Sequence, residues 1–336
     1  MSLARATFTA RRTLLTGARR YNSTTPPKPA AKSSNLPLWL GGAGIAGLSI
    51  YLYLDKGAGA QKAEQKSEPA APKKDALDPK NFVDFELKKV EPYNYNTAKF
   101  VFALPPDAAA ELPVASCVVV QSSADHPSPL KTGEGKPVIR PYTPITPDAE
   151  GELTFLIKRY DTGVMSKYIH ELKPGEKLSI KGPIPKFPFK INEFEEVGMV
   201  AGGSGITPMH QILTHALNDP SNKTRFTLIF ANIAERDILL REEFEKLRKE
   251  HPDTFNIVYT LDKPESGWKG YKGYVNKEMI MQHLGPPSLA EKVKIFICGP
   301  PGQVAAIAGK KAGMKQGELG GILKELGYTE DQVFKF

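Results

Sequence analysis

The chain has 336 residues, of which 40% are hydrophobic and 24% charged, a composition typical of a globular protein with room for about two domains. Its formal net charge of +8 does not indicate nucleic-acid binding, because residues 1–54 hold seven Lys or Arg and no acid, which leaves 38 basic against 37 acidic residues elsewhere. Two cysteines, Cys117 and Cys298, and six scattered histidines exclude a four-cysteine iron–sulfur or zinc site, and no metal is predicted.

The first residues have the composition of a targeting signal. Residues 1–22, MSLARATFTARRTLLTGARRYN, are rich in Arg, Ser, Thr and Ala and contain no acid. Because this pattern is typical of a mitochondrial presequence, we predict a targeting segment at 1–35, with a candidate processing site at Arg19–Arg20. A basic arm outside any core is the alternative.

A membrane span is predicted next. Residues 36–54, LPLWLGGAGIAGLSIYLYL, are nineteen uncharged residues that as a helix would cover about 28 Å, roughly a bilayer's hydrocarbon core. Trp39 lies near one end and Tyr51 and Tyr53 near the other, where aromatic belts occur. We therefore predict a single transmembrane helix; a buried core helix is the alternative, which the Pro-, Lys- and Ser-rich flanks disfavour. Residues 55–80 predict a flexible linker.

Residues 81–193 read as short strands separated by Pro and Gly clusters. Phe82–Leu87 and Lys99–Leu104 alternate in polarity, Cys117–Gln121 and Leu153–Lys158 are rich in β-formers, and only Met165–Leu172 is helix-like. Short strands at this spacing predict a small antiparallel β-barrel.

Residues 194–336 change to an alternation of strands and helices. This pattern predicts an α/β domain with a mostly parallel sheet, so that the whole is an α+β chain of two folded domains. The strands are expected at Val197–Val200, Phe226–Phe230, Asn256–Thr260 and Val293–Cys298, and the helices at 208–217, 237–250 and 303–312.

A glycine-rich turn follows the first of these strands. The run Gly202-Gly203-Ser204-Gly205-Ile206-Thr207-Pro208 lacks the last glycine of a nucleophile elbow, the lysine of a P-loop and the Rossmann spacing. It still opens a helix, with Thr207 suited to the N-cap and Pro208 to the first turn, so its free amides would face an anion such as a pyrophosphate. A purely structural strand–helix corner is the alternative.

Three further motifs point to the same kind of ligand. Cys298-Gly299-Pro300-Pro301 ends a later strand at the same carboxyl edge of the sheet, where ligands of open α/β sheets bind. Arg140-Pro141-Tyr142-Thr143 offers a guanidinium to a phosphate and a flat ring to an aromatic ligand. Gly163-Val164-Met165-Ser166 opens the helix of the first domain, whose amides suit a second phosphate.

In this order, R-P-Y-T, G-x-M-S, G-G-S-G-I-T-P-M and C-G-P-P resemble the series found in ferredoxin-reductase-type flavoproteins, and are most similar to those of the NADH-cytochrome b5 reductases. LIFANIAERDILLREEFEKL (228–247) and YTLDKPESGWKGYKGYV (259–275) are also similar, so the resemblance covers about 81–336. The presequence and span are similar to the mitochondrial form of fungi, which implies the outer membrane, with a processed intermembrane-space form or an inner-membrane location left open.

The resemblance implies an FAD-binding domain at 81–193 and an NAD-binding domain at 194–336, with FAD and NADH as cofactors. It places Arg140 on the FAD pyrophosphate and Tyr142 on the flavin, and assigns Gly202, Gly203 and Gly205 to NADH. It further implies FAD contacts from Pro141, Thr143, Ile157, Lys158, Tyr160, Gly163, Met165 and Ser166, and turn contacts from Ser204 and Pro208. Relatives often carry Lys in place of Val164, and some carry Pro-Met in place of Gly302-Gln303.

Two residues are expected at the reacting centre. Thr207 lies where the two domains meet and is expected near the flavin, and Cys298 is expected near the nicotinamide, with Gly299 and Pro300 shaping its pocket. Cys298 as a buried core thiol is the alternative. Asp262 follows a strand and would accept from a ribose 2′-hydroxyl and repel a 2′-phosphate, which favours NADH over NADPH; a solvated loop carboxylate is its alternative.

The resemblance implies electron transfer from NADH through FAD to two molecules of ferricytochrome b5, a haem protein held at the same membrane. Lys158, Lys167 and Lys186 are candidates for steering that acidic partner. The alternatives are a tethered flavin reductase that feeds a quinone or ferric chelate, and a nucleotide-binding adaptor without turnover.

Overall fold

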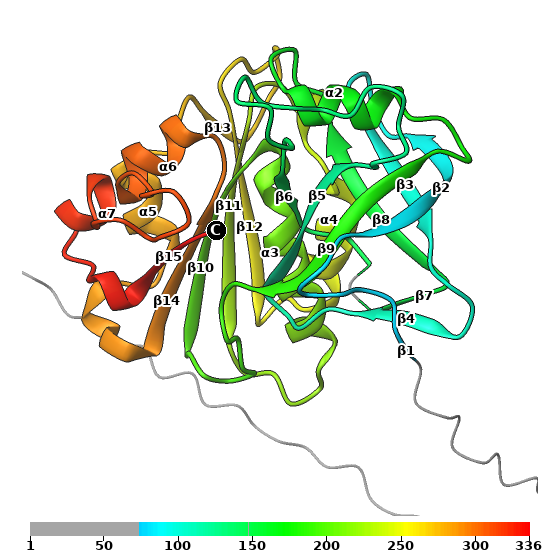
Figure 1. Ribbon diagram of the computed structural model, residues 1–336. Coiled ribbons are helices and arrows are strands. Elements are labelled where there is room, and N and C mark those ends of the chain that lie inside the picture. The colour runs from blue at the N-terminus through cyan, green and yellow to red at the C-terminus, as the bar shows by residue number, and fades with distance from the viewer. Residues whose placement is uncertain (1–73, 147) are drawn as a thin grey trace, which may run out of the picture. The chain divides into compact units, whose positions relative to one another are not determined.

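The computed structural model describes residues 74–146 and 148–336, and within these no helix has the length and apolar character needed to cross a membrane. The targeting segment, the transmembrane helix and most of the linker predicted above lie outside the described residues. The described part contains two six-stranded sheets and belongs to a single compact unit, residues 70–336 (Figure 1).

The first large sheet is antiparallel and has the strand order β6-β5-β9-β2-β3-β8. Its strands are β2 (Val83–Pro92), β3 (Thr97–Ala103), β5 (Ser116–Ser122), β6 (Arg140–Tyr142), β8 (Glu152–Lys158) and β9 (Lys177–Pro185). The pairing order is open, with β6 and β8 at its two ends, whereas the sequence predicted a barrel. Successive side chains of a strand point to opposite faces of the sheet, and this alternation explains the core of this half. The inward-facing side chains include three fully buried rings, those of Phe100, Phe102 and Phe155.

Two smaller elements complete this half. A three-stranded sheet joins β1 (Lys74–Asp75), β4 (Ala108–Glu111) and β7 (Asp148–Glu150). Helix α2 (Val164–Glu171) begins one residue before the predicted helix and buries Met165 and Ile169 against the same core.

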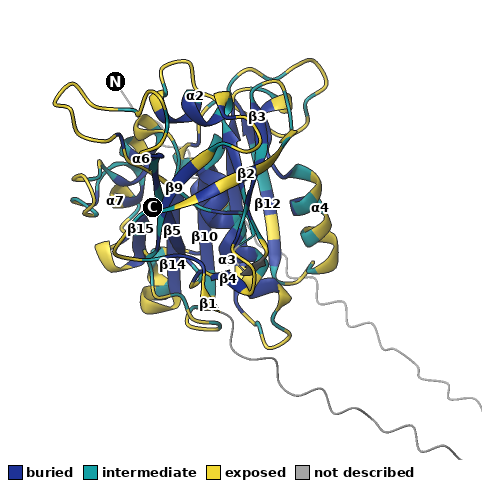
Figure 2. Cartoon of the chain, turned by 45° about the vertical axis from the view of Figure 1, so that its right-hand side comes forward, coloured by how far each residue is buried: buried dark blue, intermediate teal, exposed yellow. Residues whose placement is uncertain are grey.

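The second large sheet is entirely parallel and has the order β13-β12-β11-β10-β14-β15. Its strands are β10 (Glu196–Gly202), β11 (Arg225–Asn232), β12 (Phe255–Leu261), β13 (Tyr271–Lys272), β14 (Val293–Cys298) and β15 (Val333–Lys335). Strands β10 and β14 in the interior of the sheet are buried on both faces, as Figure 2 shows by their dark colour, so the prediction of apolar parallel strands is confirmed.

Helices cover both faces of this sheet. Helices α3 (Ile206–Asn218) and α4 (Arg241–Glu250) pack in one core, which also contains Ala115 and Leu156 of the antiparallel half. The other core takes side chains from α5 (Lys277–His283), α6 (Pro301–Ala308) and α7 (Gly321–Glu325). The first core therefore joins the two halves.

Two helix boundaries differ from the sequence prediction for backbone reasons. The helix expected from 237 begins at Arg241, because Glu235–Asp237 form a 3₁₀ turn and Leu240 takes a left-handed φ of 54°. The helix expected over 303–312 ends at Ala308, because Gly309 follows it with φ 82°, a conformation that glycine adopts without strain.

Candidate functional site

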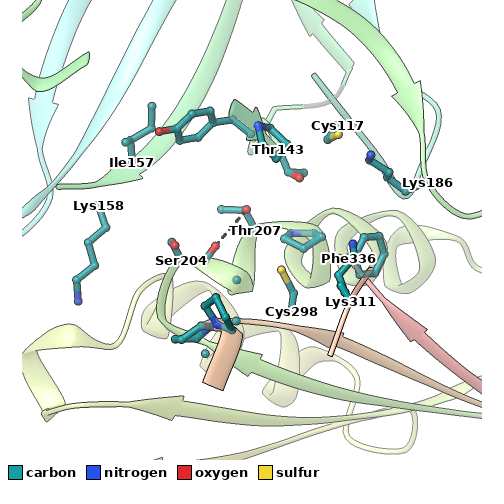
Figure 3. Close-up of a pocket in the computed structure, with 18 of the residues that line it drawn as sticks. Cys117, Thr143, Ile157, Lys158, Lys186, Ser204, Thr207, Cys298, Lys311 and Phe336 are labelled. Carbon is teal, nitrogen blue, oxygen red and sulfur yellow. Dashed lines mark hydrogen bonds between the residues drawn. The ribbon is translucent and has the colours of Figure 1, made fainter. Parts of the chain in front are cut away.

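A cavity of about 680 Å³ lies between the antiparallel sheet and the carboxyl edge of the parallel sheet, within the size range of cofactor sites (Figure 3). Of the residues predicted to bind cofactors, most line it. These are Pro141, Tyr142, Thr143, Ile157, Lys158, Tyr160, Gly202, Ser204, Gly205, Thr207, Pro208, Cys298, Gly299 and Pro300.

Strands β10, β11 and β14 of the parallel sheet end at the same height beside the cavity. In the register of the parallel sheet, Ala201 of β10 pairs with Cys298 of β14, and Gly202 pairs with Ala231 of β11. The glycine-rich turn and the Cys298–Pro301 turn therefore leave the sheet side by side. Two motifs that are far apart in the sequence thus form one wall of the cavity together.

The glycine-rich turn forms a short 3₁₀ turn before helix α3. The sequence predicted Thr207 as the N-cap, and this is wrong: Gly203–Gly205 form the 3₁₀ turn, Gly205 is the N-cap and Thr207 is the second helical residue. Gly203 takes φ 51°, which lets the helix begin earlier. The Thr207 hydroxyl donates to the Ser204 carbonyl oxygen at 3.3 Å, and Pro208 lies in the first turn, as predicted.

Gly205 shows why this turn excludes a side chain. A Cβ at this position would lie 2.5 Å from the Cys298 carbonyl carbon and 2.8 Å from the Gly299 nitrogen. The two turns thus pack backbone against backbone. Any side chain on Gly205 would separate the walls on which a dinucleotide would rest.

Tyr160 and Ser204 connect the two halves across the cavity. Their hydroxyl oxygens lie 2.7 Å apart, and they belong to the loop after β8 and to the glycine-rich turn. On the same side, Tyr142 packs edge-on against Phe155, with ring centroids 6.4 Å apart. Burial raises the pKa of Tyr142 to about 12, so its phenol stays protonated at neutral pH.

Neither cysteine of the cavity is a thiolate at neutral pH. Although Cys298 borders the cavity, burial raises the pKa of its thiol to about 12. Burial also raises the pKa of Cys117, on the facing strand β5. Cys298 therefore contributes a neutral, polarizable surface, and the nucleophilic role of an ionised thiol does not apply to it.

Seven predicted cofactor residues lie outside the cavity. Arg140 is exposed at the start of β6, and its guanidinium donates to the Ile139 carbonyl oxygen at 2.8 Å. The others are Gly163, Val164, Met165, Ser166, Gly203 and Asp262.

The residues around Gly163 form a helix start, as predicted. Gly163 is the N-cap of α2, and its carbonyl accepts a hydrogen bond from the Ser166 hydroxyl at 3.2 Å. The Ser166 oxygen in turn accepts from the Tyr160 amide at 3.2 Å, which ties the helix start to the cavity residue Tyr160. Met165 is buried in the core, and Val164 is 51% exposed.

Two polar side chains at the carboxyl edge fit a nucleotide ligand, and the sequence analysis missed both. Asn232, the last residue of β11, is 6% exposed, and neither its amide nitrogen nor its oxygen has a partner. The Gln303 amide nitrogen is also buried without a partner, and its side chain lies against Gly202. Since buried polar groups are almost always hydrogen-bonded, these amides suit a ligand with donors and acceptors. The available signal was the place of Asn232 at the end of an apolar strand and of Gln303 shortly after the C-G-P-P turn.

Asp262 lies one strand further along the same edge. Its backbone N–H donates to the Asn232 carbonyl oxygen at 3.0 Å, and burial raises the pKa of its carboxyl. Asp262 and Asn232 therefore stand side by side at this edge, and neither of them lines the cavity.

Other lining residues come from segments without a recognisable motif. The remaining lining residues are Ser116, Cys117, Leu156, Lys186, Pro301, Lys311, Gly313, Met314 and Phe336. Burial and the nearby Lys186 lower the pKa of Lys311. Phe336 arrives through β15, which pairs with β14 and brings the last residue of the chain beside Cys298.

Comparison with known proteins agrees with this geometry. The family model described as "Oxidoreductase FAD-binding domain" matches residues 84–189, and "Oxidoreductase NAD-binding domain" matches residues 199–308. The chain is 46% identical to "NADH-cytochrome b5 reductase 2" of Mycosarcoma maydis, over 100% of this chain and 97% of that protein. It is 42% identical to the protein of the same name from Phaeosphaeria nodorum, over 99% of each.

Solved structures show the same two-domain fold. The cytochrome b5 reductase domain of Ulva prolifera nitrate reductase is 28% identical, with a TM-score of 0.67 over 78% of this chain and 99% of that chain. The CS-b5R domains of human Ncb5or are 26% identical, with a TM-score of 0.59 over 76% of this chain and 69% of that chain. With full-length relatives at this identity, both domain models in order and a cavity where their predicted sites meet, the chain belongs to the NADH-cytochrome b5 reductase family.

Proposed function

We propose that this protein oxidises NADH with FAD as its resident cofactor and passes the two electrons, one at a time, to two molecules of cytochrome b5. The observation that carries this proposal is the convergence of the R-P-Y-T strand, the glycine-rich turn and the C-G-P-P turn on one cavity between an FAD-binding and an NAD-binding domain. The names of the full-length relatives support the choice of acceptor.

The residues divide into two sets on opposite walls. From the antiparallel half, Tyr142 and Thr143 would hold the flavin, and Arg140 with the helix start at Gly163–Ser166 would hold its pyrophosphate. From the parallel half, the glycine-rich turn, Asn232 and Gln303 would hold NADH. Asp262 at the same edge would disfavour the 2′-phosphate of NADPH.

The chemistry comes from the cofactors, which when bound supply hydride transfer and the release of single electrons. Thr207 and Cys298 would border the reacting atoms. There the neutral thiol of Cys298 and the hydroxyl of Thr207, which donates to the Ser204 carbonyl oxygen, would shape the pocket and orient the bound cofactors. Gly205 keeps the two turns in backbone contact, which would hold the residues of both turns at a fixed separation around the bound cofactors.

The membrane attachment and the mitochondrial location belong to this proposal. The nineteen uncharged residues at 36–54 and the acid-free residues 1–35 support a single-pass anchor in the outer membrane, with a processed intermembrane-space form as a second product. A shared membrane would raise the effective concentration of reductase and acceptor. Carbonate extraction and protease protection of mitochondria, with a variant lacking 36–54 as the control, test the anchor.

Anaerobic stopped-flow absorbance on the full-length protein tests the activity. Mixing with NADH and then with cytochrome b5 is expected to bleach the flavin and then to reduce the haem. Flavin bleaching with an oxidised haem would transfer the function to a quinone or ferric-chelate acceptor. Absence of flavin absorbance in the purified protein would favour a nucleotide-binding adaptor.

A further inference from the structure

A buried carboxylate joins the two halves beside the cavity without lining it. Asp237 lies in the turn after β11, and its side chain is 2% exposed. One oxygen, Oδ1, accepts from the Lys158 ammonium at 2.8 Å and from the Tyr95 hydroxyl at 2.6 Å. Both donors belong to the antiparallel half. The other oxygen, Oδ2, accepts from the Ala234 amide of its own turn at 3.2 Å.

The same turn is held at further points by the loop between β2 and β3. Asn94 donates from its amide to the Arg236 carbonyl oxygen at 3.1 Å. The Arg236 guanidinium lies over the Tyr95 ring, 4.7 Å from its centre. The Tyr93 hydroxyl accepts from the Leu240 amide at 2.8 Å, where the backbone of Leu240 is left-handed. The loop between β2 and β3 of one half is therefore hydrogen-bonded at several points to the turn after β11 of the other half, with Asp237 at the centre of the contact.

The charge on Asp237 is stable in this setting. Burial works to raise the pKa of Asp237, but the hydrogen bonds from Lys158 and Tyr95 outweigh it and hold that pKa below its usual range. The hydrogen bond to Asp237 also raises the pKa of Tyr95. The cluster thus consists of three groups: the Asp237 carboxylate, the Lys158 ammonium and the protonated phenol of Tyr95.

Lys158 connects this contact to the cavity. Its side chain is 10% exposed and lines the cavity, while its ammonium is bonded to Asp237. Two residues further along the chain, Tyr160 contacts Ser204 of the glycine-rich turn at 2.7 Å. The segment 157–160 is therefore fixed to the parallel half at two points, and it forms the cavity wall between them.

We propose that Asp237 is a positioning residue, which through Lys158 and Tyr95 sets the separation of the flavin-binding and nicotinamide-binding walls. Lys158 itself, predicted above as a cofactor contact, is first of all the cavity's structural tie to the other half. The proposal rests on the proposed function insofar as NADH reacts in this cavity. Hydride transfer depends steeply on the distance between the reacting rings, so a loosened wall slows it without altering the cofactors.

The test compares Asp237→Asn with Glu235→Gln by single-turnover flavin reduction at increasing NADH in the full-length holoenzyme. Glu235 lies two residues away in the same turn, but its carboxylate is 43% exposed and pairs with Arg241 on the surface, so it is a matched control. We expect Asp237→Asn to lower the limiting rate about tenfold or more, with normal flavin content and a smaller change in the NADH dissociation constant. Glu235→Gln is expected to match the wild type.

A second readout does not depend on the cofactors. Acetylation of Lys158 by acetic anhydride, followed by mass spectrometry of the protein before NADH is added, reports whether the ammonium is engaged. We expect Asp237→Asn to make Lys158 several-fold more reactive and Glu235→Gln to leave it unchanged. If NADH does not bleach wild-type flavin, the proposed function fails, while this labelling still tests the Asp237 contact.

Tyr95→Phe covers the case in which Asp237→Asn does not fold. Tyr95 is 61% exposed, and Phe keeps its ring under Arg236 while removing only the hydroxyl. A reduced limiting rate in this variant supports the proposal. Wild-type limiting rates in whichever variants fold would overturn it, as would a change confined to the NADH dissociation constant.

Discussion

The backbone contact between the two turns makes a strong prediction at Gly205. In Gly205→Ala the new Cβ would lie 2.5 Å from the Cys298 carbonyl carbon and 2.8 Å from the Gly299 nitrogen, and the Cys298 oxygen lies closer still. Ordinary contact begins near 3.4 Å, so the contact to the carbonyl carbon alone requires the turns to separate by about 0.9 Å, and the contact to the oxygen requires more. Both neighbours are backbone atoms at or directly after the end of strand β14, so they cannot rotate away as a flexible side chain could.

A displacement of this size acts directly on the reacting geometry. Thr207 and Cys298, the two residues proposed to lie nearest the reacting atoms, belong to the two turns that meet at this contact. Because a misplacement of about 1 Å can cost about a hundredfold in rate, we expect Gly205→Ala to lower the limiting rate of flavin reduction by NADH about a hundredfold. Flavin content is expected to persist, since the proposed FAD pyrophosphate contacts at Arg140 and Gly163–Ser166 lie in the other half.

Gly302→Ala is the matched control for this experiment. Gly302 lies in the turn that follows Gly299 and opens α6, and a Cβ there has nothing within 4 Å. Stopped-flow absorbance of both variants with NADH gives the limiting rates. A wild-type rate in Gly205→Ala, or an equal loss in Gly302→Ala, would refute the reasoning from backbone contact.

Three further predictions concern titration and cofactor choice. Burial lowers the pKa of His210 to about 4, so as pH falls below about 6.5 the unfolded chain takes up a proton at this residue that the folded protein does not. The free energy of unfolding should therefore fall by up to about 2 kcal/mol between pH 7 and pH 5. Denaturant titrations of His210→Gln should show that this part of the loss is gone. With a pKa raised to about 12, Cys298 should resist iodoacetamide at neutral pH in the native protein and react after denaturation, whereas alkylation of the native protein at the rate of a free thiol would contradict the assignment. Asp262→Ser should raise the kcat/KM for NADPH about tenfold or more by removing a like charge, and an unchanged NADPH-to-NADH ratio would place the carboxylate away from the ribose.

The sequence predicted those elements whose signal is local and repeated. Strand β14 occupies the predicted range Val293–Cys298, and β10, β11 and β12 extend their predicted ranges by only one or two residues at either end. Uninterrupted apolar runs bounded by turn residues are sufficient for this. The start of α3 was misplaced because the left-handed Gly203 permits a 3₁₀ turn, and a Thr-Pro pair carries no information about a preceding glycine's φ.

Residues of the site were predictable only where a motif marks them. Strand β15 has three residues, too few for a periodic pattern, yet its pairing with β14 carries Phe336 to the cavity. Lys186 and Lys311 reach the cavity from loops of the two different halves. The partner of Lys158 is also invisible in the sequence, because Asp237 lies seventy-nine residues away and meets it only through packing of the two halves.

The chemistry of the cavity is consistent with a protein that positions its ligands and does not itself transfer protons. Tyr142 and Cys298, which border it from opposite halves, have pKa values raised to about 12, so both keep their protons throughout the neutral range. The chain can instead control the distance between the two cavity walls, and contacts between the halves set this distance at more than one place. Phe187, in the segment that joins the two sheets, packs on Phe296 and Phe334 with ring centroids 5.0 and 5.2 Å away, and the Asp237 contacts hold a separate part of the same boundary. Because these contacts are apolar in one place and charged in the other, cavity residues outside them, such as Tyr142 and Thr143, need carry no share of holding the halves together, and their side chains remain available for orientation and specificity.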